Sequence, residues 1–341
     1  MSTDRSTVRS TTSQLPGRVK IKVVGVGGGG CNAITRMVHG QIQGVEFIAM
    51  NTDVQHLRGT EAPVRIPLGE RLTKGLGAGG DPITGRKCAE ESLDAIRQAI
   101  AGADMVFLAA GMGGGTGTGA IPVIARISKE AGALTVAIVT KPFTFEGNRR
   151  MTVAEEGIKQ LAGNVDTLIV VPNDRLMKLA DAKTSVNDAF KYADDVLFQA
   201  IQAVVELITV PGLINLDFAG IRNVLRNSGL AMISIGRGTG PNRTVEAARG
   251  ALANSLVDNP IEGAKRVLFG VTGGSGLSLI EIRNAANIIK QAVDPAANII
   301  FGVNVDPNMG DDARLIVIAT DLASKERTPG GYHKFSSQAP A

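Results

Sequence analysis

The feature that most constrains this chain is the segment GMGGGTGTGA at positions 111–120. It follows a short apolar run and precedes a helical pattern, with six glycines and no lysine among residues 111–119. A helix start presents unpaired N–H groups and a partial positive charge, so a glycine-rich turn before it binds anions without a cationic side chain. We therefore predict a phosphate-binding turn. The alternative, in which the glycines only permit tight strand–helix packing, explains one or two of the six.

Apolar runs alternate with helical patterns through the first half of the chain. The runs typical of buried strands are residues 19–26, 45–50, 105–110, 134–139 and 167–171. Between them, residues 90–101 and 119–131 have amphipathic helical spacing. This alternation predicts an α/β fold with a mostly parallel sheet covered by helices on both faces, and hence a Rossmann-like nucleotide-binding domain.

The pattern changes after residue 185. Residues 186–209 repeat apolar side chains at helical spacing without glycine or proline, which predicts one long, largely buried helix. Further apolar runs at 230–235, 266–271, 298–303 and 315–319 predict a second sheet, with helices at 244–256 and 277–292. The domains expected are a disordered tail (1–17), the nucleotide-binding domain (18–185), a central connecting helix (186–210), a smaller α/β C-terminal domain (211–321) and a flexible tail (322–341).

Composition excludes several classes of function. The net charge is +4 and basic residues are interspersed with acids, so we expect no nucleic-acid partner. The chain has two cysteines and three histidines without metal-ligand spacing, which suits a reducing cytosol and predicts no protein metal site. No apolar run reaches the roughly 18 residues of a membrane span, so we expect no membrane insertion. The N-terminus lacks the apolar core of a signal peptide.

A second glycine turn, GVGGGGCN, also follows a strand and opens a helix. Gly25, Gly27 and Gly30 satisfy GxGxxG, and Asp53 follows at a distance that suits a ribose-binding acid. Alone, this pattern predicts a nicotinamide-dependent oxidoreductase, an alternative that leaves the turn at 111–120 unexplained. No GxxxxGK[ST] occurs, which excludes a P-loop NTPase. Both turns together predict a polyphosphate held by main-chain amides and by the Thr116 and Thr118 hydroxyls, with Mg²⁺ neutralising the charge.

Side chains beyond these turns suit a ribose and a purine. Glu146 follows a strand, where its carboxylate would accept from ribose hydroxyls, and Arg150 would pair with a phosphate or with Glu146. The amide of Asn173 follows the next strand and would read a purine edge. Phe190 and Asp194 lie one turn apart on the long helix, which suits a stacking ring and a carboxylate that accepts from guanine N–H groups. In isolation, Phe190 would be read as core and Asp194 as surface.

With these segments in order, the chain resembles the FtsZ family, the bacterial relatives of tubulin, from about residue 20 to 321. The segments that carry the resemblance are GGGTGTG, GVGGGGCNAI, EFIAMNTD, GLGAGGDP, KPFTFEGNRRM, VPND and NLDFAGIR. The resemblance implies a cytoplasmic GTPase that uses GTP and GDP, with Mg²⁺ held mainly through phosphates. It also implies head-to-tail polymerisation with copies of itself and a role in organising the cell-division ring.

The family's site residues carry over to matching positions. The resemblance implies phosphate and ribose contacts from Gly28, Gly29, Gly30, Cys31, Asn32, Ala78, Gly79, Gly80, Gly113, Gly114, Gly115, Thr116, Gly117, Thr118, Gly119, Pro142, Glu146 and Arg150. It implies guanine contacts from Asn173, Phe190 and Asp194. Asn215 and Asp217, in the loop 213–222, would complete the catalytic site of the next subunit.

The chain departs from the family pattern at two places. The usual NxDxxD reads Asn215, Asp217 and then Gly220 here, so the second acid is absent. We expect GTP binding and assembly with slow hydrolysis; the alternatives are a neutral loop variation and a non-hydrolysing scaffold or accessory paralogue. The C-terminus, KERTPGGYHKFSSQAPA, does not resemble the family's docking peptide for membrane tethers and division proteins. The glycines at 271–279 are interpreted as an ordinary strand-to-helix turn.

Overall fold

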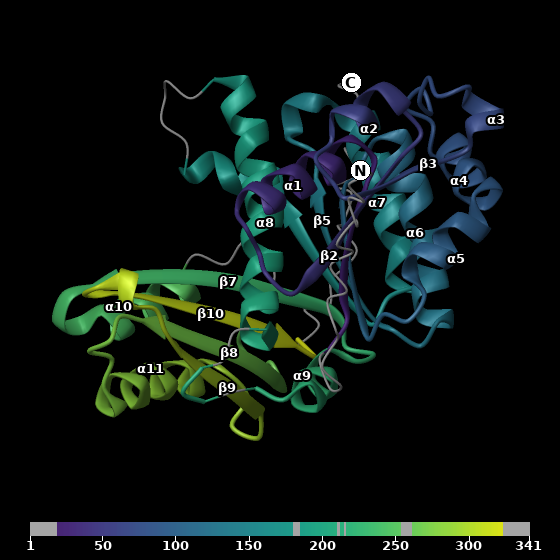
Figure 1. Cartoon of the computed structure of the whole chain (residues 1–341). Coiled ribbons are helices and arrows are strands. Elements are labelled where there is room, and N and C mark those ends of the chain that lie inside the picture. Colours follow the sequence, from purple (N-terminus) through teal and green to yellow (C-terminus); the bar gives the residue numbers. More distant parts are fainter. Residues whose placement is uncertain (1–18, 180–184, 210–211, 215, 254–260, 323–341) are drawn as a thin grey trace, which may run out of the picture.

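The computed structural model describes residues 19–179, 185–209, 212–214, 216–253 and 261–322 (Figure 1). Its strands are β1 (Ile21–Val26), β2 (Val45–Asn51), β3 (Val64–Pro67), β4 (Met105–Gly111), β5 (Leu134–Lys141), β6 (Thr167–Pro172), β7 (Gly229–Thr239), β8 (Arg266–Gly273), β9 (Asn298–Val305) and β10 (Asp312–Thr320). Its helices are α1 (Gly27–His39), α2 (Val54–Gly59), α3 (Glu70–Thr73), α4 (Pro82–Glu91), α5 (Leu93–Ile100), α6 (Gly115–Glu130), α7 (Asn148–Ala162), α8 (Val186–Thr209), α9 (Phe218–Leu225), α10 (Arg243–Ala253) and α11 (Leu279–Ala292). The short 3₁₀ turns are η1 (Thr144–Glu146), η2 (Asn173–Leu179), η3 (Gly240–Asn242) and η4 (Pro307–Met309).

The predicted α/β class is confirmed. Strands β1 to β6 pair in parallel in the order β3-β2-β1-β4-β5-β6. One apolar core lies under α1 and α8, and a second lies under α4, α5, α6 and α7, so helices cover both faces as predicted. The strands read as continuous apolar runs because both of their faces are buried.

Strand β7 joins the two halves of the molecule. Its first residues pair in parallel with β6, from Gly229 to Ala231, and the rest pair antiparallel with β10. The order then continues β7-β10-β8-β9, so the separate second sheet that we expected is instead one ten-stranded arrangement. Eleven residues make β7 long enough to pair with both neighbours. In Figure 1, β7, β8 and β10 run across the molecule at a steep angle to β5.

The long helix α8 has the predicted bounds and lies between the two halves (Figure 1). Its apolar residues, among them Leu197, Ile201 and Val204, belong to the same core as β1 and β8. The division into domains at residues 185 and 211 stays a prediction. The predicted tails, apart from Leu322, and the end of the 244–256 helix lie outside the described residues. In the described part of the chain, we find no helix with the length and apolarity needed to cross a bilayer.

Two helix predictions were wrong in their bounds. The pattern at 90–101 is the end of α4 followed by α5, separated at Ser92. The helix predicted from residue 119 is α6, which begins at Gly115, so much of the glycine segment is helix and not turn. Tertiary packing overrides the low helix propensity of glycine here.

Candidate functional site: two helix starts at one sheet edge

The helices α1 and α6 begin side by side. Helix α1 follows β1 directly and α6 follows β4 after residues 112–114, and these strands pair in parallel with Val26 opposite Ala110. Neither helix has a side-chain cap at its N-terminus or an acidic residue in its first turn. By contrast, α11 is capped by Ser278 and Glu281, so the turn at 271–279 is the ordinary one predicted. The first N–H groups of α1 and α6 are therefore available for an anion.

Four of the six glycines at 111–119 are explained by the protein's own packing, which corrects our expectation of one or two. A Cβ at Gly119 would lie 2.0 Å from the Pro82 oxygen, and one at Gly117 would lie 2.6 Å from the Gly111 oxygen. At Gly115 it would lie 2.9 Å from atoms of the 78–81 turn. Gly113 has a φ of +97°, which disfavours other residues. These glycines let α4 and β4 approach α6 closely.

Other glycines face open space. No atom lies within 4 Å of a Cβ built at Gly114, Gly79 or Gly80, and at Gly28 only His56 Cε1 does, at 3.8 Å. Gly79 and Gly80 have positive φ values, which account for glycine there. Gly28 and Gly114 have neither a positive φ nor a close neighbour. The space in front of both helix starts is thus kept free of side chains, which fits a bound phosphate chain.

In the glycine turn at 25–32, Gly25, Gly30 and Cys31 are buried. Cys31 is 0% exposed, and burial raises the pKa of its thiol to about 12, so it stays neutral in the core. A Cβ at Gly25 would lie 2.3 Å from the Gly30 oxygen, so packing accounts for these two glycines of the GxGxxG pattern. Asp53 caps α2 by accepting from the His56 N–H at 3.0 Å. The features that suggested a dinucleotide therefore have local structural causes.

The two threonines of the segment differ in role. The Thr118 hydroxyl accepts from the Gly113 N–H at 2.8 Å, and its side chain is buried, so it holds the turn before α6. The Thr116 hydroxyl lies 2.6 Å from that of Thr52, a residue that sequence reasoning missed. Pro142 is buried against the position of Gly113. Ala78 likewise packs on Gly115, which keeps the 78–81 turn beside the start of α6.

Glu146 and Arg150 meet each other. The Glu146 carboxylate accepts from the Phe143 N–H at 2.8 Å and lies 3.3 Å from Arg150 Nε. The side chain of Glu146 is 8% exposed, whereas that of Arg150 is 52% exposed. Of the two partners that we considered for Arg150, the structure shows Glu146. The pair shapes the turn that leads into α7 beside Gly113.

Three aromatic rings and an amide mark the predicted base side. Phe190 is 40% exposed and meets Phe143 edge-on, with centroids 5.5 Å apart, and Phe145 at 6.5 Å. Asn173 is 5% exposed, and its Oδ1 has no hydrogen-bond partner. A buried carbonyl oxygen without a donor is costly, so this atom fits a site completed by a ligand. Phe143 and Phe145 were missed from the sequence, although the KPFTF segment places both directly after a predicted strand.

Asp194 lies where α8 faces α1. Its carboxylate hydrogen-bonds to Asn32 and lies 3.8 Å from Arg36 Nε, while Arg36 also pairs with Asp195. Burial raises the pKa of Asp194 to about 7, against the opposing effect of Arg36; the Asp195 charge adds to the rise. Arg36 was missed from the sequence, although its position four residues after Asn32 places both on one face of α1.

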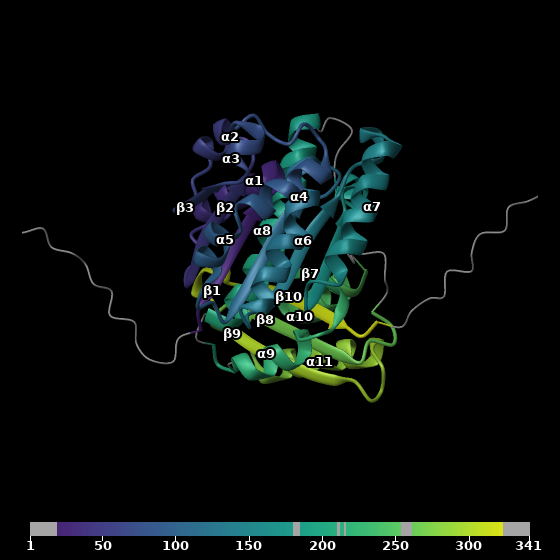
Figure 2. The ribbon, with the colours of Figure 1, turned by 90° about the vertical axis from the view of Figure 1, so that its right-hand side faces the viewer.

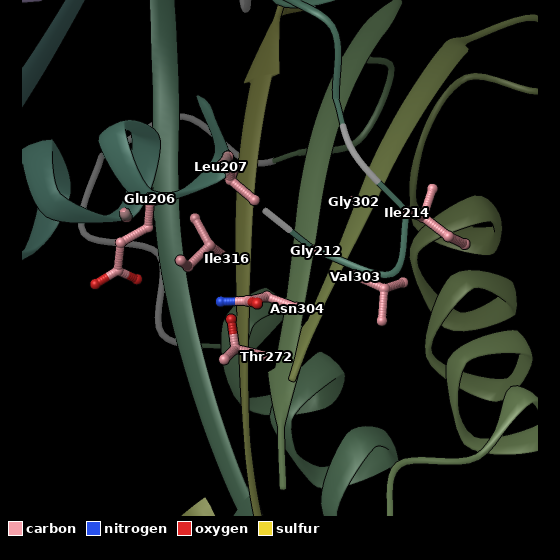
Figure 3. Close-up of a pocket in the computed structure, with 10 residues that line it drawn as sticks. Glu206, Leu207, Gly212, Ile214, Thr272, Gly302, Val303, Asn304 and Ile316 are labelled. Atoms are coloured by element: carbon pink, nitrogen blue, oxygen red, sulfur yellow. The ribbon is translucent and has the colours of Figure 1, made fainter. Parts of the chain in front are cut away.

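A polar cavity of about 840 Å³ opens beside these residues, between α1, α2 and α8. It is lined by Asn32, Thr35, Arg36, His39, Asp53, Gln55, His56, Gly59, Thr60, Lys191 and Asp194. Its volume is in the range of small-molecule sites. A second cavity lies between α8 and the C-terminal strands (Figure 3), but it holds only about 10 Å³, about one water molecule.

Asp217 lies far from the other predicted site residues. It is exposed and caps α9, its Oδ1 accepting from the Gly220 N–H at 2.7 Å. Figure 2 shows α9 and α11 at one end of the molecule and α2 and α3 at the other. One chain therefore does not bring Asp217 to the starts of α1 and α6. Asn215 lies outside the described residues. In the described ranges, no group of three or more acidic, histidine or cysteine side chains is arranged to hold a metal ion.

Comparisons with known proteins agree over most of the chain. Residues 20–181 match the Tubulin/FtsZ family, GTPase domain, and residues 229–323 match the FtsZ family, C-terminal domain. An empty FtsZ dimer from M. jannaschii is 46% identical, with a TM-score of 0.85 over 89% of this chain and 88% of that one. A point mutant of FtsZ from the same organism is also 46% identical, with a TM-score of 0.86 over 89% of this chain and 92% of that one. CetZ2 from Haloferax volcanii, a GTPγS-bound protofilament, shares the fold at 19% identity and a TM-score of 0.76, over 91% of this chain and 95% of that one.

Proposed function

The chain belongs to the FtsZ family, with its GTPase and C-terminal domains, and we propose that it polymerises head to tail and hydrolyses GTP at the junction between subunits. This family assignment rules out the oxidoreductase alternative. The observation that carries the proposal is the pair of uncapped helix starts, α1 and α6, with open space at Gly28 and Gly114.

In this proposal, each part of the site has one role. The α1 and α6 amides hold the triphosphate, the cavity that Asn32 and Asp194 line holds the guanine, and Phe190 contacts the base. Hydrogen bonds from the guanine N–H groups to Asp194 require the ionised carboxylate. A Mg²⁺ ion would be held mainly by phosphate oxygens. GTP and GDP are the expected ligands.

The exposed apolar side chains support a head-to-tail contact. Leu76 and Ile83, near α3 and α4, are 84% and 66% exposed. Leu213 and Leu279 are 72% and 77% exposed, in the loop before α9 and at the start of α11. These two groups lie at opposite ends of the molecule (Figure 2). A contact between two different surfaces at opposite ends repeats from subunit to subunit, and where its rotation does not close a ring, a filament results. Assembly would bring Asp217 of one subunit to the phosphates of the next.

We propose that hydrolysis is slow. Gly220 stands where the family pattern has a second acid, and the remaining acid, Asp217, is engaged in capping its own helix. These observations also favour a second candidate, a GTP-bound scaffold whose filament persists without turnover. In either case, we expect the protein at the site of cell division, with division proteins or membrane tethers as further partners.

The nucleotide-binding part of the proposal is tested with the whole chain and a fluorescent GTP analogue. We expect displacement by GTP and GDP but not by ATP, and loss of affinity in Asp194→Ala with the fold retained. Equal displacement by ATP would contradict a site specific for guanine. An unchanged nucleotide affinity of Asp194→Ala would show that Asp194 does not bind the base.

A further inference from the structure

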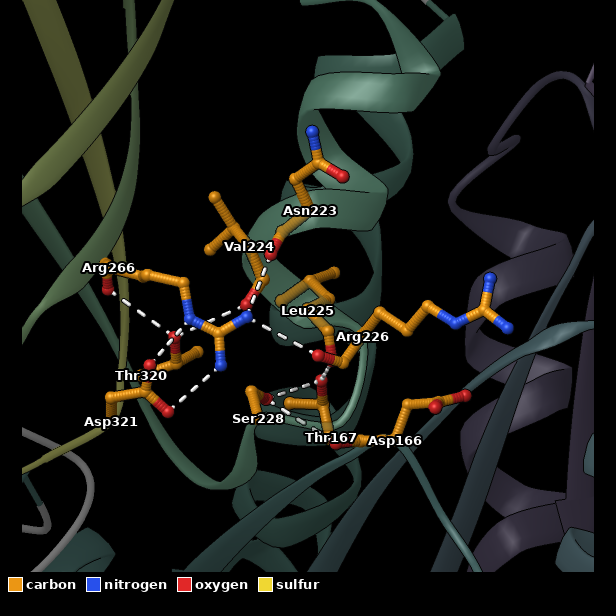
Figure 4. A network of polar contacts seen from close by, with 10 residues as sticks. All are labelled: Asp166, Thr167, Asn223, Val224, Leu225, Arg226, Ser228, Arg266, Thr320 and Asp321. Carbon is orange, nitrogen blue, oxygen red and sulfur yellow. Dashed lines mark hydrogen bonds and ion pairs between the residues drawn. The ribbon is translucent and has the colours of Figure 1, made fainter.

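The C-terminus of α9 is held by side chains from three strands. The last carbonyls of a helix have no partner within it and usually meet water or a glycine turn. Here four consecutive carbonyls, those of residues 223–226, accept from side chains (Figure 4). Arg266 Nη1 donates to the carbonyls of Asn223 and Arg226, at 2.8 and 3.3 Å. The Thr320 hydroxyl donates to the Val224 carbonyl at 3.2 Å, and the Thr167 hydroxyl donates to the Leu225 carbonyl at 2.5 Å. We call these three side chains the α9 clamp.

The clamp draws on both halves of the molecule. Thr167 begins β6 in the parallel part of the sheet, and its hydroxyl also lies 2.9 Å from that of Ser228. Arg266 begins β8 and Thr320 ends β10, both in the antiparallel part. The end of α9 is therefore fixed where the two parts join.

Arg266 is itself locked by Asp321. Its Nε and Nη2 donate to the two carboxylate oxygens of Asp321, at 2.6 and 2.9 Å, a bidentate pair. The hydrogen bonds from Arg266 lower the pKa of Asp321, so this carboxylate is ionised at neutral pH. Asp321 has a φ of +52°, an uncommon conformation for a residue other than glycine. Since Nε, Nη1 and Nη2 all donate, Arg266 has one well-defined orientation.

The other end of α9 begins at Asp217, its N-cap. Eight helical residues span about 12 Å and behave as a short rigid rod. A rotation at the clamped end therefore displaces Asp217. The loop before α9 bridges to β9 through Ile214 and Val303, and its Leu216 is buried in the core.

We infer that Arg266, oriented by Asp321, is a positioning residue for hydrolysis in the neighbouring subunit. It fixes the direction of α9 and thereby presents Asp217 at the angle that the next subunit's phosphates require. Arg266 touches neither nucleotide nor neighbour in this account. The inference depends on the proposed function, because it assigns Arg266 to the completion of that same site.

The test compares Arg266→Met and Asp321→Asn with Arg249→Met in the full chain. Arg249 is exposed on α10 and makes no polar contact among the described residues, so its replacement is the matched loss of a guanidinium. We expect Arg266→Met to lower kcat of assembled protein about 10- to 100-fold, since misplacement of a reacting group by about 1 Å is costly. Asp321→Asn should lower it less, and the double variant no further than Arg266→Met.

Nucleotide binding separates a positioning role from a purely structural one, which would change binding as well as kcat. We expect KM for GTP and the affinity of the unassembled chain to change less than about twofold, and Arg249→Met to match the parent. If Arg266→Met is unstable, the test uses Asp321→Asn alone, because asparagine keeps one oxygen that accepts a hydrogen bond from Arg266. A parent-like kcat in the folded variants would overturn the inference, as would a rise in KM without a fall in kcat. Absence of assembly-dependent phosphate release from the parent would instead overturn the proposed function.

Discussion

At the scale of single residues, Gly220 and Asp217 are the positions that set the expected rate. A Cβ at position 220 would lie 2.6 Å from Asp217 Oδ1, and that oxygen belongs to a side chain that can rotate. Any larger residue therefore displaces the Asp217 carboxylate from its capping position. An acid at 220 would add a second group to orient water in the neighbouring site.

The first prediction follows from this contact. We expect Gly220→Asp to raise phosphate release per assembled subunit by about 10²- to 10⁴-fold, the usual contribution of a positioned acid or base. Gly220→Asn is the control, because it fills the same volume and displaces Asp217 equally without a charge. Equal turnover in the parent and Gly220→Asp would show that the absent acid does not limit the rate.

Asp194 gives the second prediction. Its pKa of about 7 means that the carboxyl is mostly protonated at pH 6 and mostly ionised at pH 8. Only the ionised form accepts from both guanine N–H groups, so affinity for GDP should rise about tenfold from pH 6 to pH 8. The side chain at position 194 does not titrate in Asp194→Asn, so the GDP affinity of this variant should keep only the weak pH dependence due to the phosphates. A parent that matches this variant at every pH would contradict the role of Asp194.

At the scale of elements, the glycines of α1 and α6 fall into two classes with opposite expected behaviour. Gly28 lies within α1 and faces open space, whereas Gly119 meets the Pro82 oxygen. The first class leaves room for a ligand, and the second leaves room for the neighbouring backbone.

The third prediction separates these classes. Gly28→Ala should stabilise the chain by about 0.4–1 kcal/mol, because alanine restricts the unfolded state, yet it should weaken GTP binding by filling the phosphate space. Gly119→Ala should lower stability by about 1–3 kcal/mol through overpacking against α4. Thermal unfolding and nucleotide titration measure both effects. Unchanged GTP affinity in Gly28→Ala would place the phosphates elsewhere.

Sequence patterns predicted most of the long elements, although not α7, and missed those defined by tertiary contacts. The strands β1, β2, β4, β5 and β6 and the helix α8 have strong apolar periodicity, and each was found. The short β3 and the small α2 and α3 have no such run. A glycine in a sequence shows that a side chain is absent but not what takes its place. The approach of α4 to Gly119 depends on residues far away in the chain. Glycines that make room for neighbouring backbone were therefore predicted to make room for a phosphate.

The site was predictable in its residue types and less so in their partners. Asp194 meets Asn32, which was expected on the phosphate and ribose side, whereas Phe190, expected at the guanine with Asp194, lies against Phe143. Arg36 and Thr52 were missed because each acts through a contact with a different element. The α9 clamp was also missed, since Thr167, Arg266 and Thr320 are separated by up to 153 residues and none belongs to a recognisable motif.

At the scale of the whole molecule, the two ends carry different apolar groups, and a head-to-tail filament uses one of each. The fourth prediction is that Leu76→Glu and Leu279→Glu each fold normally but fail to form filaments, because a charge is buried at one contact. An equal mixture should form dimers and stop there, since each variant keeps one intact end. Sedimentation velocity distinguishes these states. Filaments from either variant alone would contradict the proposed contact.

The most direct test of the central claim measures phosphate release and pelleted protein in the same tube over a range of protein concentrations with GTP. Because Asp217 of one subunit is proposed to complete the site of the next, we predict no release below the concentration at which filaments appear. Above it, release should rise in proportion to the pelleted subunits. Release proportional to total protein with no threshold, or filaments that release no phosphate, would contradict hydrolysis completed between subunits.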